Sequence, residues 1–348
     1  SIVAMNGIVA MNGIIANEGG GVRIETESTT VPGTDAYHIE ILGKQFVDNS
    51  VDVTGALVDV IGNAFEGASD ATTAISYKLA TGDISNNQIS AYSKGAISLD
   101  SSAEMTLSGN QLENNTEVGI ISYDSKNIRM TENEILNTVS ADTPLNSGHG
   151  IYIHAGSEQA STDKLGLHVL EDNTVKGSGG VGIGIDSLTY GDTVENLFEM
   201  YNNTITGSAF VGINLQNTHT GVMNDNSLDD SAGYGLRCMN GPGSNSRVVF
   251  DNNRVNGTKT TAMGEDGDGV LMSDCHVSVD FNLITANERY GVYFSNNTSG
   301  GCENNKIEDH IWDIVDDGNG MTVANNTFDT QTSNTLTTNL APVVAPTL

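Results

Sequence analysis

The chain has 348 residues, and its 14 basic and 44 acidic side chains give a formal net charge of −30. Nucleic-acid binding requires patches of lysine and arginine that neutralise phosphates, so this balance argues against nucleic acid as a partner. No apolar run approaches the roughly 20 residues of a membrane-spanning helix, so we expect no membrane insertion. Such acidity is typical of an extracellular or cell-surface setting, where cations screen or bridge carboxylates.

The two ends of the chain are apolar. The first residues repeat one hexad as IVAMNG, IVAMNG and IIANEG, which places Ile2, Ile8 and Ile14 in phase. The last residues, TNLAPVVAPTL, carry Val343 and Val344 between two prolines. We expect one or both segments to pair with a second copy of the chain in an assembly. The alternative is that both fold back and cap the ends of the fold.

Two markers repeat between these ends with a base period of about 23 residues. A Gly-apolar-x-apolar motif follows most copies of an Asn-x-apolar motif, and each motif predicts a short strand with alternating apolar residues. No helical periodicity separates the strands, so each repeat predicts one coil of a solenoid that pairs with the next through parallel ladders. The asparagines of the first marker, whose side chains can bond one another along the stack, are Asn63, Asn87, Asn110, Asn133, Asn173, Asn203, Asn226, Asn253, Asn282, Asn305 and Asn326.

This pattern resembles the right-handed parallel β-helix repeat of pectate-lyase-like proteins, from about Thr73 to Phe328 and less clearly from Tyr37. The resemblance implies an all-β, single-stranded right-handed parallel β-helix (a β-solenoid) of about ten to twelve coils over residues 36–330. An apolar hexad segment precedes it over residues 1–35, and an extended tail follows over residues 331–348. The superfamily includes lyases, hydrolases, epimerases, tailspikes, adhesins and surface-layer components, so the fold does not settle the function.

The repeat is interrupted in the middle third of the chain. Loops that interrupt a solenoid usually gather on one side and shape its binding surface, so a site is expected there. The inserted segments are 137–149, 155–172, 187–202, 240–252 and 256–268.

Four side chains of the middle coils are candidates for catalysis. Alternation along the glycine-marked strands turns Tyr123, His154 and Asp186 outward on successive coils about 4.8 Å apart, with Tyr152 beside them. A histidine between a tyrosine and an aspartate can be tuned for proton transfer. An ordinary surface ladder with a His–Asp hydrogen bond is the alternative. Arg237 follows Tyr152 by three coils, about 14 Å, which is too far to serve the same reacting atom.

The motifs of known enzymatic branches are missing. The segment SGHGIYIH at residues 147–154 resembles the GHG segment of polygalacturonase-type glycosidases, but the acidic motifs that accompany it there are absent. The lyase and epimerase signatures are absent as well. With an aromatic content of only 5%, this favours an extracellular structural or surface protein that self-assembles as a filament, sheath or surface layer. The alternatives are a carbohydrate-active enzyme (lyase, epimerase or hydrolase) that uses the four residues above on a polysaccharide, and a trimeric receptor-binding spike.

Two acidic turns are candidates for calcium, the one cofactor that the sequence suggests. GEDGDG contains Asp266 and Asp268, and VDDGNG contains Asp316 and Asp317. Calcium prefers several hard oxygen ligands on a flexible turn, although solvated acidic turns have the same composition. The three cysteines have no zinc-binding spacing, and we expect them to be small buried residues.

Overall fold

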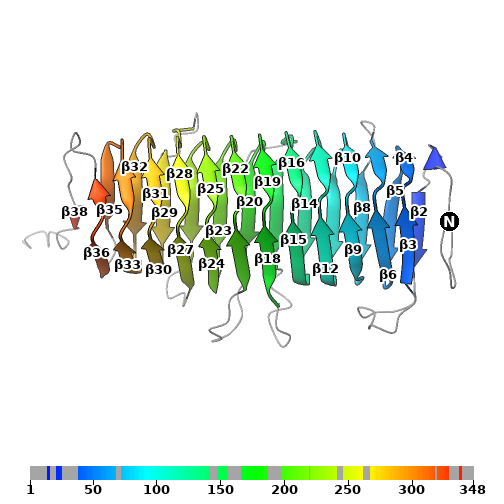
Figure 1. Ribbon diagram of the computed structural model, residues 1–348, viewed down its shortest axis with the longest axis horizontal. Helices are drawn as coiled ribbons and strands as arrows, with labels where there is room; N and C mark the ends of the chain where they lie inside the picture. Colours follow the sequence, from blue (N-terminus) through cyan, green and yellow to red (C-terminus); the bar gives the residue numbers. More distant parts are fainter. Residues whose placement is uncertain are drawn as a thin grey trace, which may run out of the picture.

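In a computed structural model, the described chain consists of short β-strands that stack into one elongated parallel β-helix (Figure 1). The three sheets contain 13, 13 and 12 strands. Neighbouring strands within each sheet pair in parallel, which confirms the predicted fold class. No helix of the described elements is long and apolar enough to cross a membrane. The structure describes residues 14–15, 21–25, 38–67, 72–141, 147–155, 166–186, 197–218, 220–240, 246–261, 267–317, 320–328 and 337–338.

Sheet A contains the strands that follow the repeated asparagines, as predicted. Each strand is only two or three residues long, because a corner precedes it and another follows. The strands are β1 (Ile14–Ile15), β4 (Gln45–Val47), β7 (Ala64–Glu66), β10 (Gln88–Ser90), β13 (Gln111–Glu113), β16 (Glu134–Leu136), β19 (Thr174–Lys176), β22 (Thr204–Thr206), β25 (Ser227–Asp229), β28 (Arg254–Asn256), β31 (Leu283–Thr285), β34 (Lys306–Glu308) and β37 (Thr327–Phe328).

Sheet B contains the strands of the glycine marker, again as predicted. They are longer than those of sheet A and supply the outer face discussed below. The strands are β2 (Gly21–Glu25), β5 (Ser50–Thr54), β8 (Thr73–Lys78), β11 (Gly95–Asp100), β14 (Val118–Tyr123), β17 (His149–His154), β20 (Val181–Asp186), β23 (Val211–Gln216), β26 (Tyr234–Met239), β29 (Asp268–Ser273), β32 (Tyr290–Ser295), β35 (Trp312–Asp316) and β38 (Thr337–Thr338).

Sheet C is formed by a third strand in each coil, which neither sequence marker predicts. Its sequences alternate but share no fixed glycine or asparagine. The strands are β3 (His38–Leu42), β6 (Leu57–Ile61), β9 (Gly82–Ser85), β12 (Ala103–Ser108), β15 (Lys126–Thr131), β18 (His168–Glu171), β21 (Phe198–Tyr201), β24 (Thr220–Asn224), β27 (Arg247–Asp251), β30 (His276–Asp280), β33 (Ser299–Glu303) and β36 (Met321–Ala324).

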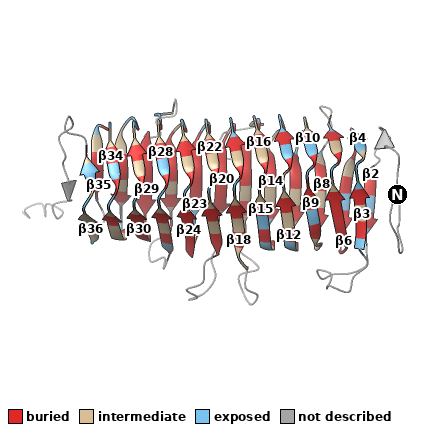
Figure 2. Ribbon diagram, in the orientation of Figure 1, coloured by how far each residue is buried: buried red, intermediate tan, exposed pale blue. Residues whose placement is uncertain are grey.

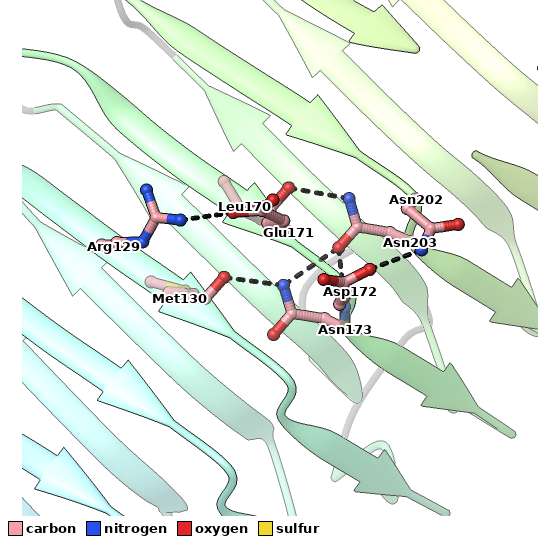
Figure 3. Close-up of polar contacts among 8 residues, drawn as sticks. All are labelled: Arg129, Met130, Leu170, Glu171, Asp172, Asn173, Asn202 and Asn203. Atoms are coloured by element: carbon pink, nitrogen blue, oxygen red, sulfur yellow. Dashed lines mark hydrogen bonds and ion pairs between the residues drawn. The ribbon is translucent and has the colours of Figure 1, made fainter. Parts of the chain in front are cut away.

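The repeated asparagines form a continuous ladder inside the corner between sheets C and A. From Asn63 to Asn326, each side-chain amide donates to the side-chain oxygen of the next asparagine over 2.8–3.2 Å. Each of these amides also donates to a backbone carbonyl of sheet C, as Asn173 does to Met130 and Asn203 does to Leu170 (Figure 3). The ladder confirms the predicted stacking of the asparagine side chains.

The left-handed residue at this corner is the one before the ladder asparagine. Asp172 has φ 55° and Asn202 has φ 54°, whereas neither Asn173 nor Asn203 has a positive φ. The exposed residue therefore takes the turn conformation, which Asn, Asp and Gly tolerate best. This leaves the ladder asparagine free to turn its amide into the core.

The interior is a continuous apolar core between the three sheets (Figure 2). The first and third residues after each marker glycine point inward, as predicted, and the three cysteines are buried and unpaired. The buried pairs of sheet B in the middle coils are Ile151 with Ile153, Ile183 with Ile185, Ile213 with Leu215, Leu236 with Cys238, Val270 with Met272, and Val292 with Phe294.

The described part of the chain includes small pieces of both terminal segments. In the segment 1–35, β1 pairs with β4 and β2 pairs with β5, and in the tail 331–348, β38 pairs with β35. The assembly residues predicted from the sequence lie outside the described residues, except for the backbone of Ile14 in β1. Their predicted role stays a prediction.

Candidate functional site

The inserted segments all adjoin sheet B. The segments 137–149 and 256–268 lead into β17 and β29, and the other three follow β17, β20 and β26 along the chain. Parts of these segments lie outside the described residues. The sequence therefore departs from its repeat on either side of the sheet-B strands along the chain, and three of the segments also include the sheet-C strands β18, β21 and β27.

The register of sheet B brings the four candidate catalytic residues together. Tyr123 pairs with His154, and His154 pairs with Asp186, so the predicted order on successive coils is confirmed. The rings of Tyr123 and His154 meet edge to face with their centroids 5.7 Å apart. Tyr152 lies in the neighbouring column, with its ring nearly parallel to that of His154 at 6.2 Å.

The Asp186 carboxylate is the centre of this cluster. Its Oδ2 accepts a hydrogen bond of 3.3 Å from the Tyr152 hydroxyl. The same oxygen lies 3.4 Å from Nδ1 of His154, close enough for an ion pair but without the geometry of a hydrogen bond. Burial, together with the charge of Asp186, raises the pKa of Tyr152, so this phenol stays protonated and acts as a donor at neutral pH. Nε2 of His154 has no partner among the described residues and remains available to a ligand.

A groove opens beside the cluster, with a volume of about 420 Å³. Lys94 and Glu117 form an ion pair across 2.9 Å at its side. Burial also raises the pKa of Tyr123. The groove therefore combines aromatic surface, phenol donors and one paired carboxylate. It is lined by Thr73, Lys94, Ser98, Glu117, Val118, Ile121, Tyr123, His149 and Tyr152.

His149 is a functional candidate that the sequence reasoning missed. Its Nδ1 accepts a hydrogen bond of 3.2 Å from the Val181 backbone N–H, and its ring stacks on Tyr152 at 5.0 Å. Burial lowers the pKa of His149 to about 4, so the ring is neutral at pH 7 and carries its proton on Nε2. This makes it a fixed donor at the groove. The signal was the GHG motif, whose central residue is His149.

Aromatic residues continue along the same face towards the C-terminus. The Arg237 guanidinium lies 5.9 Å from the ring centre of Phe210 and 5.8 Å from that of Tyr234, and it donates to Asn214 over 3.3 Å. Although aromatic residues are only 5% of the chain, half of its tyrosines gather here outside the main core. They are Tyr123, Tyr152, Tyr234, Tyr290 and Tyr293.

The aspartates proposed for calcium are dispersed. Both oxygens of the buried Asp268 accept from Arg289, over 2.7 and 2.6 Å, so this carboxylate has its counter-ion within the chain. Asp317 accepts from the Tyr293 hydroxyl over 3.1 Å, Asp316 is buried at the end of β35, and Asp266 lies outside the described residues. Within the described chain, none of them belongs to a group of three possible metal ligands. Calcium binding stays a prediction.

Gly184 provides the space that Tyr152 occupies. A Cβ at this position would lie 2.5 Å from Cδ2 of the Tyr152 ring, so we expect Gly184→Ala to displace the ring from Asp186. The phenol would lose part of its burial and its contact with Asp186, which together raise its pKa. The ¹³C resonance of the Tyr152 ring should therefore shift and titrate at lower pH. Gly301→Ala is the control, because its Cβ would meet nothing closer than 3.7 Å. An unchanged Tyr152 resonance in Gly184→Ala would contradict this assignment.

Comparison with known proteins agrees with the architecture. A family model described as right handed beta helix region matches residues 12–198 and 146–328. The structure is similar to a periplasmic alginate epimerase, AlgG, with a TM-score of 0.58 and 13% identity over 91% of this chain and 76% of that one. It is also similar to PfbA, a surface adhesin of Streptococcus pneumoniae, with a TM-score of 0.56 and 12% identity over 89% and 84% of the two chains. No curated protein matches the sequence.

Proposed function

Since the chain belongs to the right-handed β-helix family, we propose that it is a carbohydrate-active protein that binds a polysaccharide along the outer face of sheet B. Family membership alone does not choose between binding, cleavage and structural roles. The proposal depends on the site. An extended face with aromatic rings and fixed polar groups suits an extended sugar chain, whose rings stack on tyrosine and whose hydroxyls take up hydrogen bonds.

One observation supports the proposal most strongly. Asp186 accepts a hydrogen bond from Tyr152, which lines the groove, and lies 3.4 Å from His154, which stands next to the groove without lining it. The Asp186 carboxylate lies beside Nδ1 of His154, which leaves Nε2 as the ring nitrogen that can accept a proton from a substrate. The neutral His149 ring can donate from Nε2 to a sugar oxygen, and Tyr152, whose hydroxyl proton goes to Asp186, offers its ring face and a hydroxyl oxygen that can accept. This assigns proton transfer to His154 and substrate positioning to the two stacked rings.

The composition of the groove favours proton abstraction over hydrolysis. Glycoside hydrolases generally use two carboxyl groups on either side of the bond that they cleave. The carboxylate that lines this groove is Glu117, and it is ion-paired with Lys94. We therefore propose a lyase or an epimerase reaction on a uronate, although the chain lacks the signature motifs of both branches. In both reactions a base removes the proton from the carbon next to the uronate carboxylate, which takes up the electron pair. A lyase then expels the glycosidic oxygen, whereas an epimerase returns a proton to the opposite face of the carbon. An extracellular or cell-envelope location is part of the proposal, supported by the acidic surface and by the locations named for the two similar structures.

The reaction is tested by treating uronate-containing and neutral polysaccharides with the protein. Unsaturated sugar ends are followed by ultraviolet absorbance and changed ring configuration by NMR. We expect His154→Ala and Asp186→Asn to reduce turnover by a factor of about 100 or more, the usual contribution of general acid–base catalysis. Polysaccharide binding should fall much less.

The control for these variants is His276→Gln, which alters an exposed histidine on sheet C. Its turnover should equal that of the unmodified protein. Equal turnover in His154→Ala would remove His154 from the reaction, and failure to bind any polysaccharide would overturn the proposed function itself.

Self-assembly is a second proposal, supported by the edge strands at the two ends of the described sheets. Within the described chain, the sheets end at β1, β2 and β3 on one side and at β36, β37 and β38 on the other. Unpaired parallel edges can add a strand from a neighbouring molecule. Electron microscopy with and without calcium provides the test. Filaments that disappear on deletion of residues 1–20 would support assembly, and isolated rods under all conditions would contradict it.

A further inference from the structure

A histidine and three carboxylates meet on the outer face of sheet C, in the first coils of the β-helix. His38 and Glu40 are two residues apart in β3 and therefore lie on the same side of the strand. Glu40 pairs with Asp59 of β6, and the β6–β9 register places Asp83 next to Asp59 on the following coil. Neither the repeat nor the site on sheet B requires these residues.

Three of these side chains bring possible ligand atoms close together, and two of them, His38 and Asp59, are joined by a hydrogen bond. One ligand atom from each of His38, Glu40 and Asp59 lies within 4.8 Å of the other two. Nε2 of His38 is 2.6 Å from Oδ2 of Asp59. Within the described chain, no other group of histidine, cysteine and acidic residues meets this criterion.

Asp59 is held in a fixed orientation. Its Oδ1 accepts a hydrogen bond of 2.9 Å from the Asp83 backbone N–H, which turns Oδ2 towards His38. The Asp59 side chain is only 12% exposed, whereas that of His38 is 45% exposed. Asp59 is thus fixed and nearly buried, whereas His38 is open to solvent. A backbone contact that orients a ligand in this way is a regular feature of metal sites.

Within the described chain, the ion pair of these carboxylates is the one between Asp59 and His38, and it requires a protonated histidine. Within the described residues, no lysine or arginine forms an ion pair with Glu40, Asp59 or Asp83. A bound divalent cation would offset the charge of these carboxylates.

We propose that His38, Glu40 and Asp59 bind one divalent transition-metal ion of the Zn²⁺ class. Imidazole nitrogen together with carboxylate oxygen suits such ions better than Ca²⁺, which prefers oxygen ligands alone. Three protein ligands leave the remaining coordination positions to water. Because β3 is the edge strand of sheet C in the described chain, the ion would fasten this edge to β6.

The test is calorimetric titration of the full chain with Zn²⁺, and with Co²⁺ for its visible absorption. We expect one equivalent of tight binding and a Co²⁺ spectrum typical of mixed nitrogen and oxygen ligands. His38→Gln and Asp59→Asn should each weaken this binding by a factor of about 10 or more. In Asp59→Asn, the amide oxygen can keep the hydrogen bond from Asp83, so the variant should fold.

An acidic protein also binds divalent ions loosely over its surface, and the controls separate the two effects. His276→Gln changes an exposed histidine of the same sheet and should leave the titration unchanged. Thermal melting without metal should be similar for all the variants. Binding that survives His38→Gln and Asp59→Asn, or that has no defined stoichiometry, would overturn the proposal. This site lies on a different sheet from the proposed glycan site, so either proposal can fail alone.

Discussion

Asn203→Ala is expected to lower the free energy of unfolding by roughly 3–5 kcal/mol, one of the largest effects of any single substitution in this chain. The Asn203 amide donates to Leu170 and to Asn226, and its side-chain oxygen accepts from both the backbone and the side chain of Asn173. All of these groups are inside the β-helix, so water cannot replace the lost partner. Guanidinium denaturation followed by circular dichroism measures the change.

The neighbouring Asn202→Gly is a matched control (Figure 3). Asn202 is exposed and has a positive φ that glycine adopts freely. Its side-chain amide donates to Asp172 at the surface, and its backbone N–H donates to Asn224, a bond that glycine keeps. We expect it to cost less than about 1 kcal/mol. Similar losses for both variants would mean that the ladder contributes no more than the turn beside it.

The second large effect is a loss of stability between pH 6.5 and pH 4. Burial lowers the pKa of His168 to about 4, and neither ring nitrogen has a hydrogen-bond partner among the described residues. The unfolded chain binds a proton near pH 6.5, whereas the folded chain resists it, so stability is complete above pH 6.5 and falls as the pH approaches 4. A shift of this size corresponds to roughly 3 kcal/mol, and His149 adds to it in the same direction.

The variant His168→Leu isolates this contribution from the many carboxylates that also titrate in acid. Leucine has no proton to bind and fits an apolar position, so its stability advantage over the unmodified protein should grow as the pH falls from 7.5 to 4. Denaturation curves at three pH values in this range give the difference directly. An advantage that does not change with pH would show that His168 is not held neutral in the fold.

The fold could be predicted from the sequence because two positions in each coil have strict chemical requirements. The ladder position needs a side chain that both donates and accepts, and the sheet-B strands need glycine where successive coils approach closely, as Gly150 and Gly182 do. These requirements repeat visibly. Sheet C has no such requirement beyond alternation, which explains why its strands gave no marker of their own.

The candidate site was predictable only in part, for a related reason. Strand alternation and coil register predict that Tyr123, His154 and Asp186 lie together, and the register of sheet B confirms it. His149 has the same parity as the inward-facing Ile151 and Ile153, so alternation alone indicates a buried residue and not one that stacks on the outward-facing Tyr152. The concentration of tyrosines on one face is likewise invisible in the overall composition. The concentration of tyrosines depends on which strands the fold brings together in sheet B.

The stacking of the coils has a consequence for how the molecule can change in length. Each strand pairs only with its counterparts in the coils before and after, so nothing in the architecture fixes the total number of turns. A whole period can be duplicated or excised between two ladder asparagines, and the flanking coils can rejoin in register. The outer face would then lengthen or shorten in steps of about 4.8 Å, with each step adding or removing one row of side chains.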